Sequence, residues 1–308
     1  MNKVTDQQPL TPEKERITLN SINTLRTGFF YFKTYPHLFL ICLVAICIDW
    51  VLILFGLVPT SVFDLFAFLL WNSIPAPVDN SSTILLGIPI LWLNIVFTII
   101  FGTFIHCWYY SCLKQIRRNG VETYLVSSLN DSLRFLPRAV VAETIAIGII
   151  LIVGMSIYFS SALIGWEIIA SIFPQYESTE MPINPAAIML YAFLIPVIFG
   201  VFIIGLFFFV LFTYVRMSIV FDNIPGFGLN RSQKFARKYL ATTTGLILLF
   251  IAVLYLIIGG FFRMFSPSLQ TFTPLVISLF FSVIFRLVEA YKAVGLGWAY
   301  DEFKHEIS

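Results

Sequence analysis

Charged residues are scarce in this chain. Only 12% of its 308 residues are Asp, Glu, Lys or Arg, whereas 58% are hydrophobic. A soluble domain of this composition would have too little polar surface to cover itself. The scarcity therefore excludes an ordinary soluble fold and predicts a protein whose solvent is the lipid bilayer. The net charge of +2 gives no indication of nucleic-acid binding.

Cysteine and histidine are also few, and their positions exclude two kinds of site. The four cysteines are Cys42, Cys47, Cys107 and Cys112, and none lies in a predicted outer loop where a disulfide would form. We interpret them as small buried residues, with reversible lipidation of Cys112 as an alternative. The three histidines (His37, His106 and His305) lack the spacing of a zinc site on one helix face.

Catalytic motifs are missing too. The chain contains no G-x-S-x-G, no G-x-x-x-x-G-K and no H-E-x-x-H sequence. We therefore expect a protein that is not an enzyme and that holds no cofactor or metal.

Long apolar runs are abundant, and they set the fold class. A helix needs about 20 apolar residues to cross the hydrocarbon layer, and six stretches meet this condition. The predicted fold is all-α, a single polytopic membrane domain over residues 1–308 with six transmembrane helices arranged as three hairpins. The predicted spans are residues 38–57, 84–109, 139–164, 186–215, 240–262 and 272–298. Pro196 is predicted to kink the long fourth span, and Ser61–Trp71 to form a short interfacial or re-entrant helix.

Basic residues predict the orientation of these spans. If both termini lie inside, the inner segments hold 16 of the 19 Lys and Arg residues, Arg286 and Lys292 lie within the sixth span, and the outer loops hold only Arg263. Such a bias in short loops orients spans during insertion. We therefore predict a multi-pass protein of the cell membrane with cytoplasmic N and C termini.

The inner segments contain an internal repeat. Ser128 to Phe135 (SLNDSLRF) precedes the third span, and Gly228 to Phe235 (GLNRSQKF) precedes the fifth, with Leu, Asn, Ser and Phe in register. Apolar residues at helical spacing accompany the first copy and also occur within residues 1–36. Each hairpin is thus predicted to follow a cytoplasmic amphipathic helix lying on the membrane surface. The apolar stripes are Ile22, Leu25, Phe29 and Phe32 before the first span, and Tyr124, Leu125, Leu129 and Leu133 before the third.

The six-span layout and the run from Ile219 to Phe235 resemble the membrane domain of some bacterial glycerophosphoryl diester phosphodiesterases and related membrane domains of unknown function. The catalytic barrel of those enzymes would need about 250 residues, for which this chain has no room. The resemblance therefore implies a fold and no reaction.

Ionisable residues within the predicted spans are the best candidates for a site, because a charge in hydrocarbon needs a partner or water. Asp49 lies in the first span, and Arg286 and Glu289 lie on one face of the sixth. Two interpretations are open. Arg286 and Glu289 form a self-neutralising pair that helps helix packing, or they join Asp49 around a polar cavity.

Two functional classes follow. The first is a non-enzymatic membrane protein that organises lipids, other membrane proteins or copies of itself. The second is a small transporter or exporter with a polar site formed by Asp49, Arg286 and Glu289. Basic residues near the inner surface are candidate contacts for anionic lipid headgroups. They are Arg117, Arg118, Arg134, Arg138, Arg231, Lys234, Arg237 and Lys238.

The charge bias predicts a definite labelling pattern. Single cysteines placed at Asn80 or Thr179 should react with an impermeant thiol reagent added outside intact cells, because both positions lie in predicted outer loops. Cysteines at Asn119 or Gln233 should react only after the membrane is opened. Outside labelling at Asn119 would contradict the six-span orientation.

Overall fold

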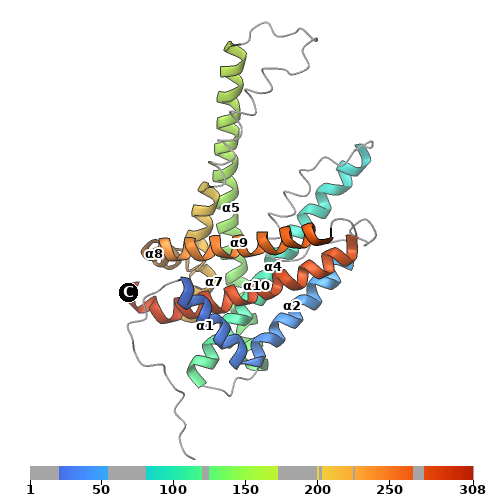
Figure 1. Cartoon of the computed structure of the whole chain (residues 1–308). Helices are drawn as coiled ribbons and strands as arrows, with labels where there is room; N and C mark the ends of the chain where they lie inside the picture. The colour runs from blue at the N-terminus through green and yellow to red at the C-terminus, as the bar shows by residue number, and fades with distance from the viewer. Residues whose placement is uncertain are drawn as a thin grey trace, which may run out of the picture. The chain divides into compact units, whose positions relative to one another are not determined.

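All the regular structure that can be described in this chain is helical. The computed structural model describes residues 21–54, 81–119, 125–172, 200, 203–224, 226–265 and 274–307. Most of these residues lie in the helices labelled in Figure 1, which confirms the predicted all-α class for this part of the chain. The helices are α1 (Ser21–Thr34), α2 (Pro36–Leu54), α4 (Ser81–Asn119), α5 (Leu125–Ile172), α7 (Val215–Asp222), α8 (Leu229–Lys238), α9 (Leu240–Phe265), α10 (Pro274–Phe303) and the short 3-10 helix η1 (Lys304–Ile307).

Two stretches among the described residues are long and apolar enough to cross a membrane. They are Pro36–Ile53 and Ile203–Asp222. The first corresponds to the predicted first span, and the second overlaps the end of the predicted fourth span and continues through α7. The six-span layout itself stays a prediction.

Most helix ends differ from the predicted span ends because the helices continue beyond the apolar runs. α4 extends ten residues past the predicted end at Tyr109, and α10 extends five past Trp298. Both extensions are more polar than the spans and carry several charged side chains. Pro196 and Ser61–Trp71 lie outside the described residues.

Two of the predicted amphipathic helices are separate elements, and each is joined to the next helix at a single residue. α1 meets α2 at Tyr35, where the following Pro36 disfavours a helical backbone. α8 meets α9 at Tyr239. Hydrogen bonds continue across both joints, since Tyr35 N donates to Tyr31 O at 2.9 Å and Tyr239 N donates to Phe235 O at 3.0 Å.

The amphipathic segment before the third predicted span differs from its prediction. The expected separate amphipathic helix before the third span is wrong, because residues 125–172 form one continuous helix with Pro137 inside it. Proline removes one backbone hydrogen bond but can be accommodated as a local bend when neighbouring turns remain paired. The amphipathic segment is therefore the first part of α5 and not an independent element.

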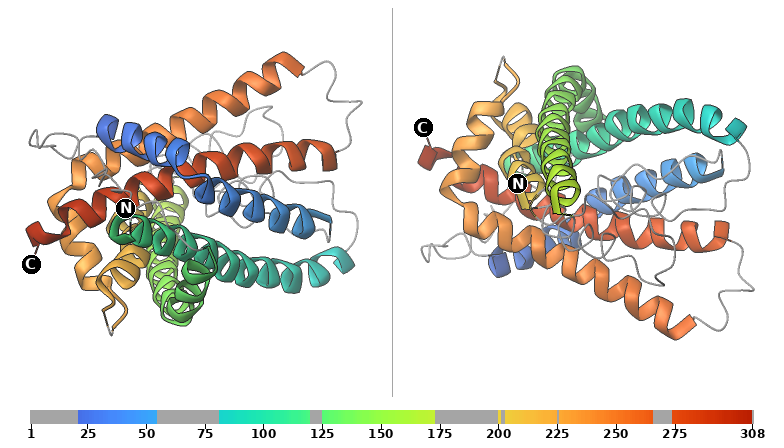
Figure 2. Two further views of the ribbon diagram at one scale, coloured as in Figure 1. Left: turned by 90° about the horizontal axis from the view of Figure 1, so that it is seen from below. Right: turned by 90° about the horizontal axis from the view of Figure 1, so that it is seen from above.

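The chain divides into two compact units, one formed by residues 1–143 and 214–308 and the other by residues 144–213. In the larger unit, α10 contacts α1, α2, α4, α7 and α9. Figure 2 shows α1 and α2 running along α10. α10 is thus the helix around which the larger unit is assembled.

Small residues allow α1 to lie directly against α10. A Cβ on Gly28 would lie 3.2 Å from the backbone of Gly295, and a Cβ on Gly295 would lie 3.0 Å from the carbonyl oxygen of Thr24. Small residues let helix backbones approach closely, particularly in membranes. Part of the apolar stripe predicted for α1 also meets α10, since the rings of Phe29 and Phe32 both contact Tyr291, whereas Ile22 remains exposed.

The close contact between α1 and α10 predicts the effect of a single methyl group. Gly295→Ala should lower the free energy of unfolding by about 1–3 kcal/mol, because the new Cβ meets a backbone oxygen that cannot rotate away. The matched control is Gly148→Ala, whose Cβ would have nothing within 4 Å. Thermal unfolding in detergent measures both, and equal stabilities would contradict the packing described.

Candidate functional site

A buried arginine on α10 is held by an aspartate on α2. Arg286 is 2% exposed and Asp49 is 1% exposed. Arg286 Nε donates to Asp49 Oδ2 at 2.5 Å, and Nη2 donates to Oδ1 at 2.6 Å. Two parallel charge-assisted bonds of this kind are among the strongest polar contacts in proteins and fix the orientation of both groups.

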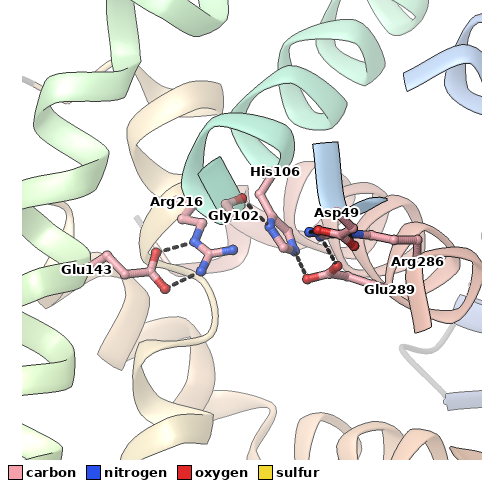
Figure 3. Close-up of polar contacts among 7 residues, drawn as sticks. All are labelled: Asp49, Gly102, His106, Glu143, Arg216, Arg286 and Glu289. Carbon is pink, nitrogen blue, oxygen red and sulfur yellow. Dashed lines mark hydrogen bonds and ion pairs between the residues drawn. The ribbon is translucent and has the colours of Figure 1, made fainter. Parts of the chain in front are cut away.

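The same guanidinium group contacts a second carboxylate. Arg286 Nη1 donates to Glu289 Oε2 at 2.5 Å, one turn along α10. The other oxygen of Glu289 lies 3.4 Å from His106 Nε2 on α4. His106 Nδ1 lies 2.7 Å from the carbonyl oxygen of Gly102, which can only accept, so Nδ1 carries the proton. Figure 3 shows these groups in one row, so that Arg286 and its partners join α2, α4 and α10.

A second buried ion pair connects α5 with α7. Arg216 Nε and Nη2 donate to the two carboxylate oxygens of Glu143. Figure 3 shows this pair on the far side of His106 from Arg286. α4, which carries His106, also contacts α7 and α10. Among its described residues, the larger unit therefore contains two fork-shaped Arg–carboxylate contacts, each between different helices.

The arrangement is suited to fixing helices in place. Asp49 and Arg286 are enclosed by protein atoms, and both oxygens of Asp49 accept from the same guanidinium group. An arginine stays protonated inside proteins, and removing one partner of a buried pair is costly. The described geometry thus matches a dry contact between helices more closely than the lining of a water-filled cavity.

Asp49, Arg286 and Glu289 do come together, but Arg286 and Glu289 do not form a pair by themselves. Arg286 binds Asp49 through two nitrogens and Glu289 through one. Sequence reasoning missed His106, which it considered only as a metal ligand, and the pairing of Glu143 with Arg216. The available signal for that pairing was that Glu143 and Arg216 carry opposite charges and belong to different apolar segments.

The run from Ile219 to Phe235 forms a corner between α7 and α8. Asp222 Oδ2 accepts from the Tyr300 hydroxyl at 2.6 Å and lies 2.7 Å from Arg231 Nε in an ion pair. Gly228 has a φ of 66°, and a Cβ there would lie 2.1 Å from Ser218 Oγ. Only glycine suits this position. The run that carries the family resemblance is therefore a structural corner held by Asp222.

The eight predicted headgroup contacts fall into two groups. Three of them are in ion pairs: Arg231 with Asp222, Arg117 with Asp301 and Glu302, and Lys238 with Glu306. The other five have no hydrogen bond or ion pair with any described residue. They are Arg118, Arg134, Arg138, Lys234 and Arg237.

The prediction that all four cysteines are buried is wrong for Cys47, which is exposed, whereas Cys42, Cys107 and Cys112 are buried. Cys112 lies toward the C-terminal end of α4. Burial raises the pKa of its thiol to about 12. A shielded, protonated thiol is a poor nucleophile, so the geometry favours the interpretation of Cys112 as a packing residue over lipidation.

No family model, curated protein or solved structure matches this chain.

The forked contact predicts strong coupling between Asp49 and Arg286. Arg286→Met should destabilise the protein by about 3–5 kcal/mol, because two buried carboxylates lose their shared partner. The change should cost less when made in an Asp49→Asn background, where one of those carboxylates is absent. Arg286→Lys is the charge-matched control, and it should rescue only partly because lysine cannot form the fork. Additive effects in a double-mutant cycle of unfolding free energies would contradict this geometry.

Proposed function

We propose that this chain is a non-enzymatic, multi-pass protein of the cell membrane that organises lipids or partner proteins at the inner membrane surface. In this proposal it has six spans, both termini are cytoplasmic, and its partners are membrane lipids, other membrane proteins or copies of itself. The proposal combines the charge bias of the sequence with the surface of α1, α5 and α8.

The observation that carries the proposal is that these helices expose apolar and basic side chains together. On α1, Ile22 is 69% exposed, and the basic Arg26 lies one turn further on. At the start of α5, Val126 and Leu133 are 69% and 50% exposed, close to Arg134. Helices of this composition lie in the membrane interface with the apolar groups in the acyl boundary and the cations at the headgroups.

α8 has the same character with fewer apolar groups. Phe227, which is 45% exposed, precedes it, and Lys234 and Arg237 are exposed along it. An anionic surface attracts such cations. The inner face of this protein thus offers several basic amphipathic elements, which is the property expected of a protein that gathers lipids or docks partners.

The buried ion pairs also support an organising role. Asp49, Glu289 and Glu143 all accept from arginines within the same unit. Groups used in this way hold the helices together and are not left available for a transported ion or substrate. The resemblance to phosphodiesterase membrane domains implies the same kind of fold and remains an expectation.

A transporter is the second candidate, and one observation favours it. His106 lies against Glu289 within a buried charged network. Proton relays in transporters are built from such groups. The two candidates make opposite demands on the network, which allows them to be separated.

A variant without the three buried charges distinguishes an organising protein from a transporter. We expect the combined variant Asp49→Asn, Arg286→Met, Glu289→Gln to keep its activity in a deletion-complementation assay, because removing all members of a buried charge cluster together is often tolerated. Protein levels are measured in parallel, and Arg286→Met alone serves as the destabilised control. A combined variant that accumulates normally but is inactive would favour the transporter.

A further inference from the structure

The three inner helices share a local pattern that their sequences only partly reveal. Each has a buried hydroxyl residue followed two positions later by an exposed cation: Thr24 and Arg26 on α1, Ser132 and Arg134 on α5, and Ser232 and Lys234 on α8. The last two pairs are in register in the internal repeat. α1 follows the same pattern although its sequence does not align over the repeat.

Helix geometry places the two members of each pair on opposite faces. Each residue turns a helix by about 100°, so two residues differ by roughly 200°. When the hydroxyl residue faces the protein interior, the cation must therefore point away from it. Packing of one face thus determines the direction of the charge on the other.

Firm contacts hold the hydroxyl faces in place. Thr24 lies against Gly295 of α10, where the two backbones are in close contact. Ser132 and Ser232 are completely buried. Phe135 and Phe235, which are equivalent in the repeat, are both buried beside their serines. The three helices are therefore fixed about their own axes.

The outward cations are uncommitted. Within the described part of the chain, Arg26, Arg134 and Lys234 make no hydrogen bond or ion pair. This separates them from Arg117, Arg231 and Lys238, whose charges are matched by acidic residues of the same chain. Cations that have no internal partner and lie among exposed apolar side chains are suited to an anionic surface.

We propose that Arg26, Arg134 and Lys234 form an equivalent set of contacts for anionic phospholipid headgroups, one on each inner helix. The inference rests on the proposed function and names its lipid partner. Exposed apolar neighbours such as Phe30 and Leu133 enter the acyl boundary, and the long basic side chains reach back to the phosphates. Arg117, Arg231 and Lys238 instead form ion pairs within the chain.

The test compares lipid preference in variants of equal charge. The full chain is purified in detergent and titrated with phosphatidylglycerol or phosphatidylcholine, and bound lipid is counted by native mass spectrometry. The variant Arg26→Gln, Arg134→Gln, Lys234→Gln should lose most of its preference for phosphatidylglycerol, by about fivefold per residue and roughly 100-fold in all. The variant Arg26→Lys, Arg134→Lys, Lys234→Arg keeps every charge and should keep the preference.

The matched control is Arg117→Gln, Arg231→Gln, Lys238→Gln, which also removes three positive charges. It should unfold at a lower temperature yet keep its preference for phosphatidylglycerol. Equal loss in both neutral variants would overturn the proposal, because net charge alone would then explain binding. Competition by millimolar inorganic phosphate would also overturn it, since the site would then take free phosphate. Because this is a binding measurement, its failure is distinct from failure of the complementation assay.

Discussion

The forked contact between Arg286 and Asp49 is the interaction on which the arrangement of the larger unit depends. It connects α10 to α2, and through Glu289 and His106 it extends to α4. A charge in this environment is tolerated only when it is fully paired. Any shift of α2 along α10 would leave a buried charge without its partner, so the contact fixes the register of these helices.

A fixed register of the helices also determines which side chains α1 exposes. α10 contacts α1 as well as α2, and the close approach at Gly28 and Gly295 sets how α1 lies. The joints at Tyr35 and Tyr239 keep their backbone hydrogen bonds, so α1 is coupled to α2 and α8 to α9. The proposed lipid contacts are therefore placed by the same packing that the buried ion pairs stabilise.

The sequence predicted the helical class, the importance of Asp49, Arg286 and Glu289, and the repeat at Ser132 and Ser232, because apolar length, buried charge and register are local properties. It did not predict that Asp49 is the main partner of Arg286, since residues 237 positions apart are brought together only by packing. Nor did it predict which side of α1 is buried. The predicted stripe described only the side of α1 expected to face the membrane, whereas Thr24 and Gly28 lie on the side that packs against α10, because close helix contact selects small residues.

The most direct test of this account is a distance measurement in a lipid bilayer. Solid-state NMR with ¹⁵N-labelled arginine and ¹³C-labelled aspartate can measure dipolar coupling between the Arg286 guanidinium and the Asp49 carboxylate, assigned by its loss in Asp49→Asn. The account predicts strong coupling from both Nε and Nη2, as N···O distances of 2.5 and 2.6 Å require. Absence of coupling in folded protein would show that this contact does not join the helices and would contradict the account.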